Sequence, residues 1–191
     1  MVIVVEVELL AADLAGDEAL VQELVDIINA AYAVGEAGLW VEGATRTRPG
    51  EIAEAVRSGG MLAAALDGRL VGCAYVRPLS ADTADLGLIS AIPEVWGCGV
   101  GRGLIRSAEE LMRSRGVATM QLELLVPKGR THPKKEQLRA WYTRLGYGVV
   151  RTAPFEQVAA HLAAQLAMPC EFLIFEKPLG AGSTREAAPR A

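Results

Sequence analysis

Apolar residues recur every three or four positions in several stretches of the chain, which is the spacing of one face of an amphipathic helix. This pattern predicts four helices, over residues 17–34, 51–57, 104–115 and 138–145. Proline is favoured in the first turn of a helix and glycine at its end, so Pro49 and Gly116 support two of these boundaries. A fifth helix is expected over 155–167, before Pro169.

Shorter apolar segments, several of them alternating with polar residues, predict strands. They cover residues 2–9, 61–66, 70–77, 83–92, 119–126, 147–152 and 171–177. The second and third flank Asp67-Gly68-Arg69, a sequence typical of a hairpin turn. Because helices and strands are mixed along one chain, we predict a single α/β domain with a mixed sheet over 1–178. Residues 179–191 are rich in Gly, Ala, Ser and Pro, and we expect a disordered tail there.

Composition narrows the classes of function. The chain has 191 residues, 51% of them hydrophobic, which suits one domain of ordinary size. A net charge of −4 argues against a protein that binds nucleic acid. The start is acidic and no run of 18 apolar residues occurs, which argues against a signal peptide and a membrane span. The three cysteines and two histidines lack ligand spacing, so we expect a reduced, cytoplasmic protein without a metal ion.

A glycine-rich turn joins the strand over 83–92 to the helix that follows. Four glycines alternate with other residues between Trp96 and Leu104. The first backbone N–H groups of a helix have no partner within it, and glycines let an anion approach them closely. The turn therefore predicts a site for a phosphate-bearing ligand. Its spacing fails the G-x-G-x-x-G dinucleotide pattern, and no Gly-Lys-Ser/Thr of a P-loop occurs.

The glycine turn resembles the pyrophosphate-binding motif of the GNAT superfamily of acyl-CoA-dependent N-acyltransferases. That motif reads Arg or Gln, two residues, Gly, one residue, then Gly or Ala; Gly99 and Gly101 match it, whereas Trp96 stands where Arg or Gln is usual. A second segment, residues 138–147, is similar to the family's closing helix, Ala-x-x-Phe-Tyr-x-x-x-Gly-Phe, with Trp141 and Tyr142 as its aromatic pair. The two motifs stand in the family's order.

The resemblance implies a fold and a co-substrate. A central mixed sheet of about seven strands would be flanked by helices and would open in a V-shaped splay where acetyl-CoA binds. Backbone groups of Ile89, Ser90 and Ala91 would bond the pantetheine arm. The pyrophosphate would be held by the turn, that is by Gly97, Cys98, Gly99, Val100, Gly101 and Arg102. Arg102 is either a phosphate ligand or an exposed first-turn side chain, and Cys98 either a reactive thiol or a tolerant variable position.

The implied reaction is direct attack of a primary amine on the thioester of acetyl-CoA in a ternary complex. Tyr142 matches the family's tyrosine near the thioester sulfur, although alone it also fits a core tyrosine. Tyrosine titrates near ~10 and a thiol near ~8.5, so a hydrogen bond to the developing thiolate is favoured over complete proton transfer. Glu123, on the strand expected to border the splay, is the candidate base; Glu94 and Asp85 are weaker candidates, and a water chain is an alternative.

The acceptor would enter, by the same resemblance, over the first two helices and their loop. This loop carries both charges and an indole: Glu36, Trp40, Glu42, Arg46 and Arg48. Carboxylates suit an amine and arginines suit a carboxylate, so a small, amino-acid-like amine is indicated. Residues 155–167 are an insertion that we expect to cover a sheet edge or to make a homodimer contact. The alternative functions are a non-catalytic acyl-CoA-binding or sensing module and a protein or peptide N-terminal acetyltransferase.

Overall fold

A seven-stranded sheet forms the centre of the molecule. The computed structural model describes residues 5–180, and its strands lie in the order β1-β2-β3-β4-β5-β7-β6. They are β1 (Val5–Leu9), β2 (Met61–Leu66), β3 (Arg69–Pro78), β4 (Thr83–Ala91), β5 (Thr119–Pro127), β6 (Gly148–Pro154) and β7 (Cys170–Pro178). β4 pairs with β5 in parallel and the other neighbours are antiparallel, which confirms the mixed α/β sheet.

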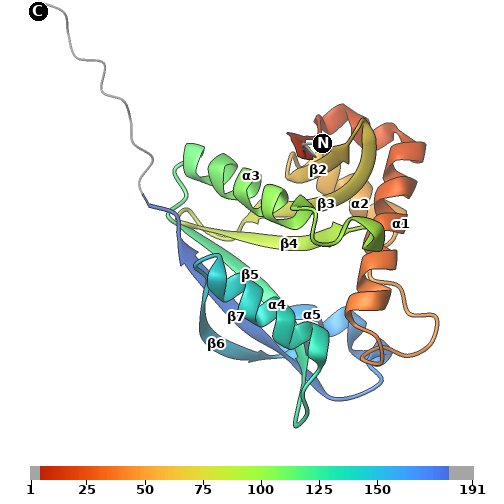
Figure 1. Cartoon of the computed structure of the whole chain (residues 1–191), viewed down its shortest axis with the longest axis vertical. Coiled ribbons are helices and arrows are strands. Elements are labelled where there is room, and N and C mark those ends of the chain that lie inside the picture. Colours follow the sequence, from red (N-terminus) through yellow and green to blue (C-terminus); the bar gives the residue numbers. More distant parts are fainter. Residues whose placement is uncertain (1–4, 181–191) are drawn as a thin grey trace, which may run out of the picture.

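Helices cover both faces of this sheet (Figure 1). They are α1 (Glu18–Gly35), α2 (Pro49–Arg57), α3 (Val100–Ser114), α4 (Pro133–Arg144) and α5 (Phe155–Ala159), with three short 3₁₀ turns, η1 (Ala12–Gly16), η2 (Pro93–Val95) and η3 (Ala160–Gln165). Apolar residues of α3 and α4 pack with one face in the largest cluster, while α1 and α2 pack on the other. The helices predicted before residue 150 are confirmed, although α3 and α4 begin four and five residues earlier than expected, at Val100 and Pro133.

The helix α1 positions the loop that follows it. Its start is capped by Asp17, whose carboxylate accepts hydrogen bonds from the backbone of Ala19 and Leu20, as expected for an N-cap. Near its end, Asn29 Oδ1 accepts the backbone N–H groups of Arg46 and Thr47 at 2.8 and 3.1 Å. The loop between α1 and α2 is therefore held against the second half of α1.

The single helix predicted over 155–167 is wrong in part. α5 ends at Ala159, where the backbone leaves the helical region, and a 3₁₀ turn follows. The chain there is drawn toward the loop after α1: Val41 N–H bonds the carbonyl of Gln165 at 2.8 Å, and Ala167 N–H that of Leu39 at 2.9 Å. These long-range bonds outweigh helix propensity. The segment packs on the face of β5 and β7.

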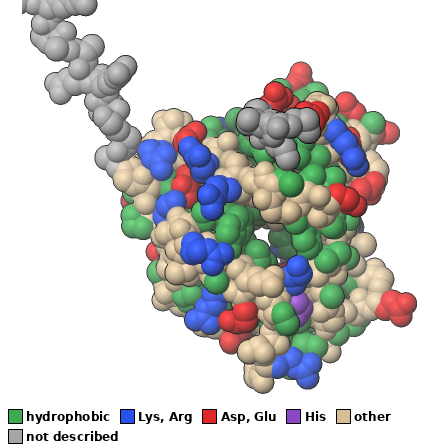
Figure 2. Space-filling model, in the orientation of Figure 1, with side chains coloured by type: hydrophobic (Ala, Val, Ile, Leu, Met, Phe, Trp, Pro, Cys, Tyr) green, Lys and Arg blue, Asp and Glu red, His purple; other side chains and the backbone are tan. Residues whose placement is uncertain are grey.

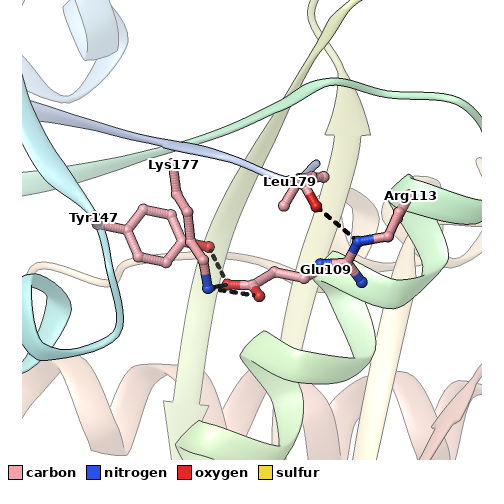
Figure 3. A network of polar contacts seen from close by, with 5 residues as sticks. All are labelled: Glu109, Arg113, Tyr147, Lys177 and Leu179. Atoms are coloured by element: carbon pink, nitrogen blue, oxygen red, sulfur yellow. Dashed lines mark hydrogen bonds and ion pairs between the residues drawn. The ribbon is translucent and has the colours of Figure 1, made fainter. Parts of the chain in front are cut away.

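A polar network ties α3 to the last strand (Figure 3). Glu109 on α3 accepts hydrogen bonds from the Tyr147 hydroxyl at 2.9 Å and from Lys177 Nζ at 2.8 Å. Burial, then the charge of Glu109, raises the pKa of Tyr147, so its hydroxyl remains a donor. Arg113 Nε donates to the carbonyl of Leu179. Leu179 is buried, so the expected disordered tail does not begin at this residue. The rest of the expected tail, 181–191, lies outside the described residues.

Candidate active site

Two neighbouring strands diverge in the middle of the sheet. β4 and β5 pair only at Thr83–Thr119, Ala84–Met120 and Asp85–Gln121. Beyond Asp85, β4 continues paired to β3 alone and β5 to β7 alone, which confirms the expected V-shaped splay. The facing edges of both strands thus keep backbone N–H and C=O groups without sheet partners. Such groups are available to bond an extended ligand in the manner of an added strand.

A β-bulge bends β4 where the splay opens. The register against β3 shifts between Cys73 and Tyr75, because β4 contains one extra residue there. Leu88 in this bulge has a φ of +51°, a conformation that few residues other than glycine adopt. Bulges bend a strand and often lie next to active sites, where the surrounding structure holds the strained residue in place. The bulge lies just beyond Asp85, the last residue of β4 that pairs with β5.

A cavity of about 920 Å³ occupies the splay. Figure 2 shows its mouth as a hollow between the parts of the surface formed by α3 and α4, with hydrophobic and cationic side chains around it. The favoured candidates Tyr142 and Glu123 line this cavity. So do all the residues expected to bind acetyl-CoA: Ile89, Ser90, Ala91, Gly97, Cys98, Gly99, Val100, Gly101 and Arg102. The two predicted motifs and the candidate base therefore meet in one place.

The glycine turn lines the cavity beside the start of α3. Gly97 and Gly99 have φ values of +86° and +93°, and Gly99 directly precedes α3. A left-handed residue at this point costs glycine little, which explains the glycines physically. The first N–H groups of α3 are available to an anion, whereas the N–H of Cys98 already bonds the carbonyl of Val95 at 3.1 Å. The exposed Arg102 lies in the first turn.

Two tryptophans shape this end of the cavity. A Cβ on Gly101 would lie 3.1 Å from Cη2 of Trp141, so this glycine lets α4 approach α3. Trp96, in the place of the family's Arg or Gln, donates its indole N–H to the carbonyl of Ala91 at 2.8 Å. That carbonyl, which we had assigned to the pantetheine arm, is thus already engaged. Lys134 Nζ lies 4.8 Å from the centroid of the Trp96 ring.

Tyr142 belongs to the hydrophobic core and also lines the cavity. The residue is 6% exposed, and its ring packs edge-on against Phe175 and Tyr147. Among the described residues its hydroxyl has no hydrogen-bond partner, although the residue lines the cavity. Burial, and then the nearby Tyr32 and Glu36, raise the pKa of Tyr142 above its ordinary value. At neutral pH this hydroxyl is therefore protonated and can donate a hydrogen bond.

Glu123 is an acidic residue of the cavity whose pKa lies near neutral pH. Burial, then the charge of Asp85, raises its pKa to about 7, although Arg77, Arg46 and Arg151 oppose the shift. A carboxylate with this pKa suits a general base. Asp85 is paired with Arg77 at 3.1 Å, and Glu94 is exposed and does not line the cavity. The structure thus favours Glu123 over the two weaker candidates.

The carboxylates of the loop after α1 were expected to bind the acceptor amine, and the structure does not support this role. Glu36 is buried and bonded to Lys135 Nζ at 2.6 Å and to the indole N–H of Trp40 at 2.5 Å. It is therefore not free to hold an amine. Glu42 is exposed and, like Arg48, does not line the main cavity. Arg46 and Trp40 do line it.

Several cavity residues escaped the sequence analysis. Lys135 reaches Glu36 from a helix 99 positions away, and no local pattern signals that contact. Arg77 was detectable in principle, because pairing the predicted strands 70–77 and 83–92 brings it opposite Asp85. Apolar residues of the segment over 155–167 and of β7 also line the cavity, namely Val158, Ala159, Leu162 and Phe172.

Judged by geometry alone, residues 5–180 contain neither a metal site nor a membrane-spanning helix. In that part of the chain no three His, Cys, Asp or Glu side chains are grouped so that they could hold a metal ion. Across the same residues, no helix is both long and apolar enough to cross a membrane.

Comparison with known proteins identifies the same family as the motifs. The model of the Acetyltransferase (GNAT) family matches residues 21–147. No curated protein sequence matches the chain. Similar solved structures include an aminoglycoside 6'-N-acetyltransferase complexed with coenzyme A, at 17% identity over 97% of this chain and 99% of that one, with a TM-score of 0.68.

Two further structures share the fold. The ribosomal-protein-S18-alanine N-acetyltransferase of Escherichia coli is 16% identical over 95% of this chain and 98% of its own, with a TM-score of 0.63. The PaiA N-acetyltransferase of Thermoplasma acidophilum, in complex with coenzyme A, is 17% identical over 92% of this chain and 99% of its own, with a TM-score of 0.62. Their names cover acceptors as different as an antibiotic and a ribosomal protein, so fold similarity leaves the acceptor open.

Proposed function

The chain belongs to the acetyltransferase (GNAT) family, and on that premise we propose that it transfers the acetyl group of acetyl-CoA to a primary amine of a small molecule. One observation carries the proposal: a single cavity through the splay joins the glycine turn to Tyr142 and Glu123. A group held on the turn and an amine beside Glu123 would share this space. In this proposal the glycine turn is the acetyl-donor end of the cavity, and the space beside Glu123 is its acceptor end.

The residues at the donor end fit acetyl-CoA. The unpaired edge of β4 near Ile89 offers backbone partners for the amide-rich pantetheine arm. The first turn of α3 offers N–H groups to the pyrophosphate, and Arg102 adds a positive charge there. Because Trp96 occupies the carbonyl of Ala91, we expect the arm to bond β4 before that residue.

Two side chains divide the proton chemistry. Glu123 as carboxylate would accept a proton from the ammonium group of the acceptor, either directly or through water. The neutral amine that remains then attacks the thioester carbonyl. The C–N bond then forms and the C–S bond breaks. Tyr142 would donate a hydrogen bond to the departing sulfur as negative charge develops there, an interaction stronger in the transition state than before it.

The acceptor end favours a small amine over a protein chain. Residues of α5 and η3 wall this end, and their backbone is bonded to the loop after α1 through Val41 and Gln165. A wall at this position leaves less room for an extended peptide than an open groove would. The cytoplasmic location and the homodimer expected from the sequence stay predictions.

A thiol-release assay with acetyl-CoA and a panel of primary amines tests this function. We expect thiol release that depends on both the amine and the enzyme, with an acetylated amine as product. Binding of CoA without turnover of any amine would instead support the non-catalytic acyl-CoA-binding module. Turnover of peptide N-termini alone would support the protein acetyltransferase.

A further inference from the structure

Arg46 is a cation without an anionic partner in the acceptor half of the cavity. Two other cations there each hold a carboxylate, since Arg77 pairs with Asp85 and Lys135 with Glu36. Arg46 is half-buried and makes no ion pair with any residue in 5–180. Its guanidinium instead lies over the ring of Tyr32, with Cζ 5.0 Å from the ring centroid. A partly buried charge that lacks a counter-charge is costly unless a ligand supplies one.

The backbone that presents Arg46 is held in place. Asn29 Oδ1 accepts the N–H groups of Arg46 and Thr47, and Asn29 Nδ2 donates to the Thr47 carbonyl at 3.2 Å. Thr47 is itself buried, and its hydroxyl donates to Glu51 at the start of α2 at 2.9 Å. The backbone that carries the guanidinium is therefore fixed before any ligand arrives, and the Tyr32 ring supports the side chain itself. Preorganisation of this kind lowers the cost of binding.

Arg46 and Glu123 face the same space. Both line the cavity, and the charge of Arg46 is one of those that oppose the rise in the pKa of Glu123. An acceptor whose ammonium lies at Glu123 thus shares the cavity with the guanidinium of Arg46. The planar fork of arginine matches a carboxylate in two parallel hydrogen bonds.

Most of the remaining wall of this half is apolar. Apart from His161 of η3, it consists of aromatic and aliphatic side chains from β5, α5, η3 and β7, namely Leu125, Val158, Leu162 and Phe172. Trp40 adds an indole whose N–H is already committed to Glu36. A ligand in contact with these side chains gains most from an apolar substituent.

We propose that the acceptor is an amino acid with an apolar side chain, whose carboxylate is bound by the Arg46 guanidinium. This proposal rests on the proposed acetyl transfer and specifies its acceptor. The amine would lie at Glu123, the carboxylate at Arg46 and the side chain against Phe172 and Leu162. Arg46 is then a specificity-determining residue that binds the carboxylate of the acceptor and not its reacting nitrogen.

The test compares L-leucine with L-leucinamide as acceptors, in the wild type and in Arg46→Gln. The amide keeps the amine and the side chain but lacks the anionic group. We expect Arg46→Gln to lower kcat/KM for leucine about tenfold or more, mainly through KM, because a charge-assisted bidentate pair is lost. For leucinamide we expect a change of less than about threefold. Comparing the two enzymes on each substrate cancels the different basicities of the two amines.

Two further variants are controls. Arg48→Gln makes the same substitution two residues away, outside the main cavity, and should leave the preference for leucine unchanged. Arg46→Lys keeps the charge but loses the fork, and should retain part of the preference. If Arg46→Gln lowers kcat/KM equally for acid and amide, Arg46 acts by packing on Tyr32 and the proposal is wrong.

A binding measurement separates this proposal from the proposed function. In the presence of CoA, N-acetyl-leucine should bind the wild type about tenfold more tightly than N-acetyl-leucinamide, and Arg46→Gln should abolish the difference. If this holds but no amine is acetylated, acetyl transfer fails while the carboxylate site stands. If leucinamide and other neutral amines are acetylated as well as leucine, or neither acetylated compound binds, the carboxylate site is overturned.

Discussion

Glu123 and Tyr142 are tuned for different parts of one reaction. Burial raises the pKa of both, to about 7 for Glu123 and above its ordinary value for Tyr142. The carboxylate is therefore close to the point where it can accept a proton at neutral pH, while the phenol holds its proton firmly. Complete transfer from Tyr142 to a thiolate becomes still less favourable than it is for an exposed tyrosine, so its role is that of a hydrogen-bond donor.

Replacing Glu123 with Gln should change the pH dependence of the rate. A base works when deprotonated, so the wild-type rate should fall as pH decreases through about 7, the pKa of Glu123. The variant should be about 10²- to 10⁴-fold slower and should lack this inflection. The measurement is kcat/KM against pH with an amine that itself titrates well above 8, so that the two ionisations are separated. An unchanged inflection in Glu123→Gln would assign it to another group.

The loop after α1 is bonded to α4, the helix that carries Tyr142. The centre of this contact is the Glu36–Lys135 pair, whose side chains are only 5% and 4% exposed. The indole of Trp40 bonds the same carboxylate, and the ring of His132 lies 3.1 Å from the carbonyl of Ala37. A buried charge pair is costly to break from one side, because the remaining charge stays buried without compensation.

Lys135→Met should destabilise the protein by about 3–5 kcal/mol, because it leaves the carboxylate of Glu36 buried alone. The matched control is Lys134→Met, which removes a neighbouring lysine over the Trp96 ring and should cost no more than about 1 kcal/mol. Urea denaturation measures both. Equal losses for the two variants would mean that the pair does not hold the loop after α1 against α4.

The sequence predicted elements better than it predicted contacts. The stripe of α1 and the alternation in β5 are local patterns, and both elements appear within two residues of their expected ends. The break of the 155–167 helix, the bulge at Leu88 and the Glu36–Lys135 pair depend on residues far apart in the chain. Local sequence propensity cannot predict contacts between residues that are far apart in the chain. Glu36 shows the consequence, since its type suggested an amine ligand and its burial beside Lys135 excludes that role.

The whole molecule consists of two parts of one sheet that separate around the cavity. Three residue pairs join β4 to β5, and the Glu109–Lys177 network adds a link between α3 and β7. A ligand that contacts both α3 and α4 would bridge the two parts. It would stabilise the folded protein by mass action.

Coenzyme A should therefore raise the melting temperature. A ligand present at 100 times its Kd adds about 2.7 kcal/mol, which corresponds to a shift of several degrees for a protein of this size. Differential scanning calorimetry at rising CoA concentrations measures the shift, with adenosine as a control that lacks the pyrophosphate. An unchanged melting temperature in millimolar CoA would contradict the donor site.

The most direct test of acetyl transfer in this cavity is the kinetic effect of Tyr142→Phe. The ring keeps its contacts with Phe175 and Tyr147, so melting temperature and CoA affinity should be nearly unchanged. Loss of the one hydrogen bond to the leaving sulfur should lower kcat by about 10²- to 10³-fold. A folded variant that binds CoA normally and keeps kcat within about twofold, with chemistry rate-limiting, would show that Tyr142 only packs the core and that the reaction site is misassigned.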